Sequence, residues 1–105
     1  AFSGKLGRDL TAEQGMEAAR LALLNGLAIA RQELGTLDRI KRDVKVVGYV
    51  ASAEGFVQQP KGLNGASDLL VEIFGEAGRH VRVAVGAAEL PRGAPVEIEV
   101  ILAIS

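Results

Sequence analysis

Two ionic side chains stand inside Val- and Ile-rich runs near the C-terminus, and their types and setting make them the first candidates for chemistry. Arg82 lies within residues 81–85, and Glu97 lies within residues 96–100. The alternating apolar pattern predicts a strand for each run, joined by a connection that contains Leu90-Pro91. If the strands pair, a guanidinium and a carboxylate can converge into a small-molecule site. A cross-strand ion pair that only fixes the strand register is the simpler interpretation.

Alternation also assigns the residues of these two runs to faces. Every second residue is β-branched or Leu, and this set is predicted to lie under helices. Its members are Val81, Val83, Val85, Val96, Ile98, Val100, Leu102 and Ile104. The opposite face would then carry Arg82, Ala84, Glu97 and Ile101. Because that face mixes apolar and ionic residues, it is predicted to be a subunit interface.

A long helix is predicted from Ala12 to about Leu34. Thr11 and Gln14 have the spacing of a capping box, and Gly35 supplies a C-terminal stop. Apolar residues then recur every three or four positions, as on one face of an amphipathic helix. After a charged segment at residues 36–44, which is predicted to be a solvated loop, residues 44–52 predict a buried strand.

A second helix is predicted to start near Pro60 and to end at Gly75. Its apolar stripe consists of Leu63, Ala66, Leu70 and Ile73. Asn64 and Ser67 on this helix are expected to help to begin or bend it. His80 is the single histidine, and no further ligands at suitable spacing suggest a metal site, so a surface or hydrogen-bonding role is expected.

Composition limits the function classes that fit. The chain has 105 residues, 49% of them hydrophobic, which predicts one domain over residues 1–105. There is no cysteine, which excludes disulfides, thiolate metal sites and a cysteine nucleophile within these residues. A formal charge of −1 provides no field for a polyanion, so a nucleic-acid partner is disfavoured. No membrane-spanning or signal pattern is present in the sequence, and a cytoplasmic location is expected.

Several segments resemble one known family. They are Arg-Val-Ala-Val-Gly at residues 82–86, Glu-Leu-Pro at 89–91, Pro-Val-Glu-Ile-Glu-Val at 95–100, Gly-Lys-Leu-Gly-Arg-Asp-Leu at 4–10, and Leu-Asn-Gly-Ala-Ser-Asp-Leu-Leu at 63–70. Together with Phe-Gly-Glu-Ala-Gly-Arg-His at residues 74–80, they resemble the YjgF/RidA family and its bacterial endoribonuclease-like subgroup. The resemblance covers almost the whole chain, and the order and spacing of the segments make it specific.

The resemblance implies a fold and an activity. The fold would be a chorismate-mutase-like α+β protomer, with two helices packed on one face of a mixed sheet. Three such protomers would form a homotrimer with pockets between neighbouring subunits. Family members with demonstrated chemistry hydrolyse reactive enamines and imines, such as 2-aminoacrylate, to a 2-oxo acid and ammonia, and they use no metal or organic cofactor.

The resemblance also implies roles for individual residues. Arg82 matches the family arginine that holds the substrate carboxylate, a role that suits the planar donor fork of a guanidinium. Glu97 matches the family glutamate that handles water and protons near the reacting carbon. Ala84 stands where deaminating relatives often have a cysteine, which excludes a thiol there. Asn64 and Ala84 are further candidates for substrate binding, and the resemblance implies that Asn64 and Asp68 border a pocket near the second helix.

Two alternatives to deamination remain open at the level of sequence. One is a trimer that binds small carboxylates or 2-oxo acids without turnover, and the other, with less support, is an endoribonuclease. Family chains usually begin with an N-terminal strand hairpin, and these 105 residues are expected to lack it. The sheet is then expected to have an unpaired edge.

Overall fold

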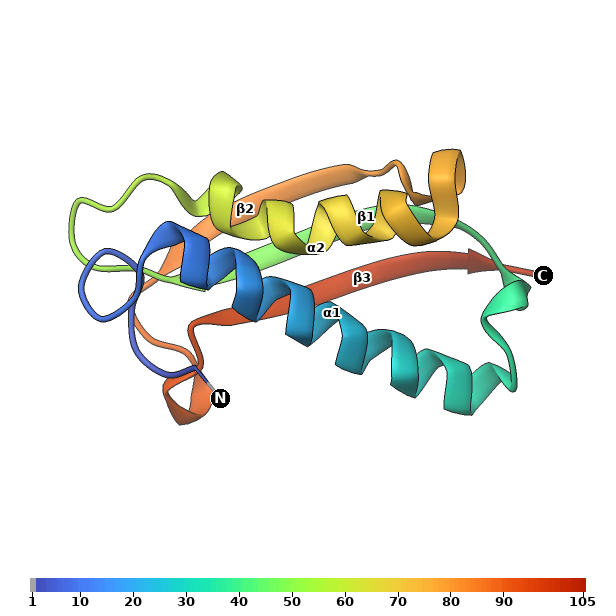
Figure 1. Ribbon diagram of the computed structural model, residues 1–105, viewed down its shortest axis with the longest axis horizontal. Helices are drawn as coiled ribbons and strands as arrows, with labels where there is room; N and C mark the ends of the chain where they lie inside the picture. The colour runs from blue at the N-terminus through green and yellow to red at the C-terminus, as the bar shows by residue number, and fades with distance from the viewer. Residues whose placement is uncertain (1) are drawn as a thin grey trace.

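Helix α1 spans Ala12–Leu34 and begins and ends as its capping residues predict (Figure 1). The computed structural model describes residues 2–105, so Ala1 of the predicted domain lies outside the described residues. Thr11 Oγ1 accepts a hydrogen bond from the Gln14 amide, and Gln14 Oε1 accepts one from the Thr11 amide. Gly35 follows with a φ of 83°, a left-handed conformation that glycine adopts without a Cβ clash.

Helix α2 spans Gln59–Phe74, with Pro60 in its first turn and Gly75 at its end, as predicted. Leu63, Ala66 and Leu70 are buried. Ile73 is 44% exposed, so its predicted place in the apolar stripe is wrong. Phe74 packs against the core at that end of the helix instead.

A mixed three-stranded sheet lies behind both helices in the view of Figure 1. Its strands are β1 (Ile40–Ala51), β2 (Val81–Ala87) and β3 (Val96–Ile104). Strand β1 is central, parallel to β2 and antiparallel to β3. The chain crosses from β1 to β2 through α2, and such a helical crossover joins parallel strands.

This topology corrects two predictions about the strands. The strands of Arg82 and Glu97 do not pair with each other, because β1 lies between them. The charged segment at residues 36–44 is also not all loop. A short 3₁₀ helix at Leu37–Arg39 leads directly into β1, whose first residues are paired with the end of β3. Pairing with a partner strand satisfies the backbone there, and the exposed side chains of Lys41 and Arg42 remain solvated.

The helix-facing side of the sheet matches the prediction for β3 from Val96 to Val100 and contradicts it for β2. Ile104 at the end of β3 is 48% exposed, so its predicted place under the helices is wrong. Val96 is buried, and Ile98 and Val100 pack against the core. Val81 and Val83, by contrast, are 67% and 40% exposed, and Val85 is exposed with them. In β2 the helix-facing residues are Arg82 and Ala84. Strand β2 also lies close to the start of α2. A Cβ on Gly86 would lie 2.9 Å from Gln59 Nε2, so a residue without a side chain permits this close approach.

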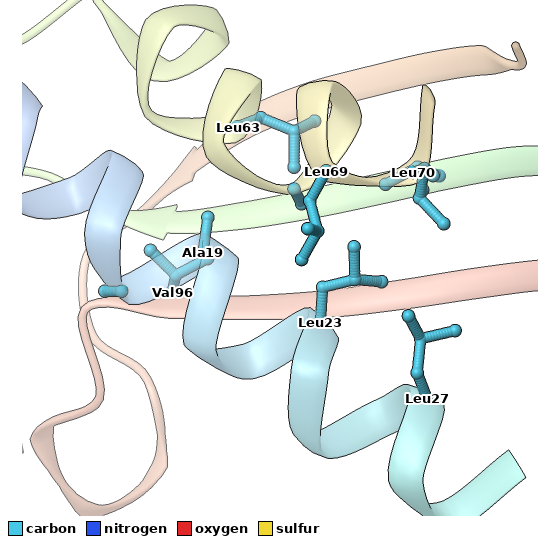
Figure 2. Close-up of a cluster of buried hydrophobic side chains, with 10 residues drawn as sticks. Ala19, Leu23, Leu27, Leu63, Leu69, Leu70 and Val96 are labelled. Carbon is cyan, nitrogen blue, oxygen red and sulfur yellow. The ribbon is translucent and has the colours of Figure 1, made fainter. Parts of the chain in front are cut away.

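The core lies between the helices and the sheet. Figure 2 shows side chains of α1 meeting those of α2 and β3. Those labelled are Ala19, Leu23, Leu27, Leu63, Leu69, Leu70 and Val96. Among residues 2–105, no helix has both the length and the apolar character needed to cross a membrane.

The uncovered side of the sheet, which we term the outer face, consists of three cross-strand rows. The rows are Val81, Lys45 and Ile101; Val83, Val47 and Glu99; and Val85, Tyr49 and Glu97. Six of these nine side chains are apolar or aromatic, and five of the six are exposed, whereas Val47 in the centre is buried among its neighbours. Such a concentration of exposed apolar side chains is typical of an interaction surface.

Candidate functional site

Arg82 points from β2 toward helix α2. Its Nη1 group donates hydrogen bonds to Asn64 Oδ1 at 2.6 Å and to Ser67 Oγ at 3.2 Å. Asn64 and Ser67 are three residues apart on α2, so both side chains lie on the same side of that helix. These contacts fix the orientation of a half-buried guanidinium.

Ser67 is also bonded to His80, which completes a chain of polar side chains. Ser67 Oγ lies 2.9 Å from His80 Nε2. On the other side of the ring, His80 Nδ1 lies 2.8 Å from Asp43 Oδ2 and 2.6 Å from the Gly78 carbonyl oxygen. The chain runs from Asp43 through His80 and Ser67 to Arg82. The hydrogen-bonding role predicted for His80 is therefore confirmed.

The Gly78 carbonyl defines the tautomer of His80. A carbonyl oxygen can only accept, so Nδ1 carries the proton of the neutral ring. Nε2 is then an acceptor, and the Ser67 hydroxyl donates to it. The Nδ1 proton is directed to Gly78, and Asp43 has no hydrogen bond of its own despite its close approach to the ring.

Asp43 is a fully buried carboxyl group. Burial raises its pKa, because the ionised form loses its hydration, whereas a positive charge on His80 lowers it. A bulge places the side chain. In a regular strand, Asp43 would share the outer face with Val47 and Tyr49, but the register shift between Asp43 and Lys45 turns it toward His80.

Arg82, Ser67 and His80 border an open depression of about 310 Å³, whereas the buried Asp43 does not line it. Its lining consists of Asn64, Ser67, Asp68, Val71, Arg79, His80 and Arg82. A guanidinium at its wall can bind a carboxylate with two parallel hydrogen bonds. The depression therefore combines an anion-binding group with a hydroxyl and an imidazole.

Glu97 lies elsewhere in the protomer. Arg82 is opposite Val46 on the helix side of the sheet, whereas Glu97 is opposite Tyr49 on the outer face. With strands about 4.8 Å apart and a rise of about 3.3 Å per residue, the two Cα atoms are roughly 14 Å apart. The predicted convergence of Arg82 and Glu97 on neighbouring strands is wrong within one protomer.

Of the other predicted residues, Asn64 reaches Arg82 directly, whereas Ala84 packs against the core and does not line the depression. The contributions of Ser67 and Asp43 were missed. Ser67 could have been found from its three-residue spacing after Asn64 on a predicted helix. Asp43 had no such signal, because a bulge brings it to His80.

Comparisons with known proteins place the chain in a family. Residues 1–98 match the family described as "YjgF/chorismate mutase-like, putative endoribonuclease". The chain is 44% identical over 105 residues to protein TCP17 of Trypanosoma cruzi, covering 99% of this chain and 66% of TCP17.

Two solved structures are similar throughout the chain. Protein Atu1372 of Agrobacterium tumefaciens, whose function is unknown, is 45% identical with a TM-score of 0.97, over 99% of this chain and 67% of Atu1372. A "putative endoribonuclease" of Shewanella oneidensis MR-1 is 40% identical with a TM-score of 0.92, over 96% of this chain and 67% of that protein. The chain thus spans about two thirds of the length of these relatives. On this evidence, it belongs to the YjgF/chorismate mutase-like family.

Proposed function

We propose that this protein hydrolyses small enamines or imines that carry a carboxylate, such as 2-aminoacrylate, to a 2-oxo acid and ammonia. The observation that carries the proposal is the placement of Arg82. Its guanidinium is oriented by Asn64 and Ser67 at the wall of an open depression, where it can bind a substrate carboxylate. Membership of the family supports this assignment.

The proposed catalytic role of Glu97 requires a second protomer. A small substrate held by Arg82 cannot touch Glu97 of the same chain, because the two residues lie on opposite faces of the sheet. Glu97 belongs to the outer face, whose apolar rows suit contact with another copy. We propose a homotrimer in which the Glu97 carboxylate of one copy serves the Arg82 depression of another.

The test is the release of pyruvate and ammonia from 2-aminoacrylate generated in situ by a serine dehydratase, corrected for spontaneous hydrolysis. Arg82→Ala should lower kcat/KM about 100-fold, because a charged hydrogen-bonding pair to the substrate is lost. Arg31→Ala removes an arginine from the last turn of α1 and should leave the rate unchanged.

A matched pair of variants tests Glu97. Glu97→Gln should lower the rate by about 100-fold or more if the carboxylate transfers protons. Glu99→Gln changes the next carboxylate on the same face and should have little effect.

Equal rates for wild type and Arg82→Ala would contradict the proposal. No acceleration, with 2-oxo acid binding that depends on Arg82, would point to a binding protein, whereas RNA cleavage by both proteins would point to a nuclease.

A further inference from the structure

We propose that Ser67, His80 and Asp43 form a nucleophilic triad that hydrolyses small carboxylate-bearing esters. This is an activity distinct from the hydrolysis of enamines. A nucleophilic serine requires a base within hydrogen-bond reach and a third group that orients the base. Here, Ser67 Oγ is 2.9 Å from His80 Nε2, and His80 Nδ1 is 2.8 Å from Asp43 Oδ2.

Neutral His80 carries its proton on the ring nitrogen that this chemistry needs. Because Nδ1 donates to the Gly78 carbonyl, Nε2 is free to accept the proton of Ser67. When Nε2 gains that proton, the ring becomes positive beside the buried Asp43, and the two charges then stabilise each other. The Gly78 carbonyl holds the ring through its hydrogen bond to Nδ1, and Asp43 lies beside the same nitrogen, where it can stabilise the charged ring.

Stability does not explain why a carboxylate occupies this position. Asp43 is fully buried and has no hydrogen bond within the described residues, and a buried carboxyl group in that state lowers stability. A bulge in β1 is also needed to bring it to His80. Bulges of this kind often redirect a side chain near an active site.

The reaction requires no co-reactant other than water. Ser67 Oγ bonds to the ester carbonyl carbon as its proton passes to His80 Nε2. The bond from carbon to the alcohol oxygen breaks, and His80 returns the proton to the departing alkoxide. Water then attacks the acyl-serine, His80 takes its proton and returns it to Ser67 Oγ, and the free acid leaves.

Arg82 defines the substrate class. Its Nη1 group contacts Asn64 and Ser67, and within residues 2–105 its Nη2 and Nε groups donate to no protein atom. Arg82 lines the same open depression as Ser67 and His80. A short ester with a carboxylate at its acyl end can therefore bind Arg82 while its carbonyl group approaches Ser67.

The experiment uses the anionic ester p-nitrophenyl succinate, with neutral p-nitrophenyl acetate for comparison. We expect a burst of p-nitrophenolate with the succinate ester and a succinyl group on Ser67 in the peptide mass spectrum. Ser67→Ala should abolish the label, and His80→Gln and Asp43→Asn should slow acylation about 100-fold. Ser52→Ala removes a hydroxyl that donates to the Val50 carbonyl instead of to a base, and should have no effect. Circular dichroism would establish that each variant is folded.

If neither ester reacts, a second measurement tests whether His80 acts as the base for the side chain at position 67. The sequence contains no cysteine, so Ser67→Cys introduces a single thiol. Its alkylation by iodoacetamide at neutral pH should be about 10-fold slower when His80→Gln is added, because the thiol loses the base that accepts its proton and less of the reactive thiolate forms. The inference is overturned if His80→Gln leaves this rate unchanged, or if the ester labels only other residues.

Discussion

Asp43 is the residue whose surroundings differ most from those its type prefers. Burial raises its pKa above the ordinary 3.8, so above pH 3.8 the folded state retains a proton that the unfolded state loses. The contribution of Asp43 to the free energy of unfolding must then fall as the pH rises through this window. The side chain that Asp43→Asn introduces cannot ionise. The free energy of unfolding of this variant, relative to that of wild type, should therefore increase as the pH rises from below 3.8. Urea unfolding at a series of pH values measures this difference.

The exposed Asp38 supplies the control for that measurement. Asp38→Asn also removes one carboxylate, but from a solvated position, and its stability should follow that of wild type through the same range of pH. If Asp43→Asn and wild type lost stability in parallel, the buried carboxyl group would not be the cause of the pH dependence.

At the scale of elements, the spacing of α1 and α2 depends on Gly65. A Cβ at this position would lie 1.9 Å from the Met16 carbonyl oxygen, which is rigid helix backbone. Gly65→Ala should therefore separate the helices and destabilise the protein by about 2 kcal/mol, as overpacking does. Gly26→Ala meets no atom within 4 Å and should stabilise α1 by about 0.5 to 1 kcal/mol. Thermal unfolding compares the two variants, and equal midpoints would contradict close contact between the helices.

At the scale of the whole molecule, the outer face suits the proposed trimer. Val83 lies in the middle row of this face and is 40% exposed in the protomer. Val83→Asp would bury an unpaired charge in the interface, so we expect trimers to dissociate to monomers at micromolar concentration. Sedimentation velocity measures the change. Val57→Asp, at a loop residue that is 79% exposed, should leave the mass unchanged. A monomeric wild type, or an unaffected Val83→Asp, would contradict the trimer.

Local patterns in the sequence determined the helices and the existence of strands. The capping box at Thr11 and Gln14, the stop at Gly35 and the alternation in residues 81–87 and 96–104 act within a few residues of each other. Such signals depend on backbone conformation and side-chain period, which a sequence contains directly. The importance of Arg82 was also visible, because an arginine inside a Val-rich strand is uncommon and matches the family motif.

Only the tertiary structure decided which face of β2 is covered and which side chains meet. Alternation shows that Val81, Val83 and Val85 share a face, but the position of α2 turns Arg82 inward and leaves these valines outside. Strand order separates Arg82 from Glu97, and a bulge brings Asp43 to His80. These outcomes depend on contacts between residues far apart in the chain. Such contacts arise when the elements pack, and no periodicity within a single element specifies them.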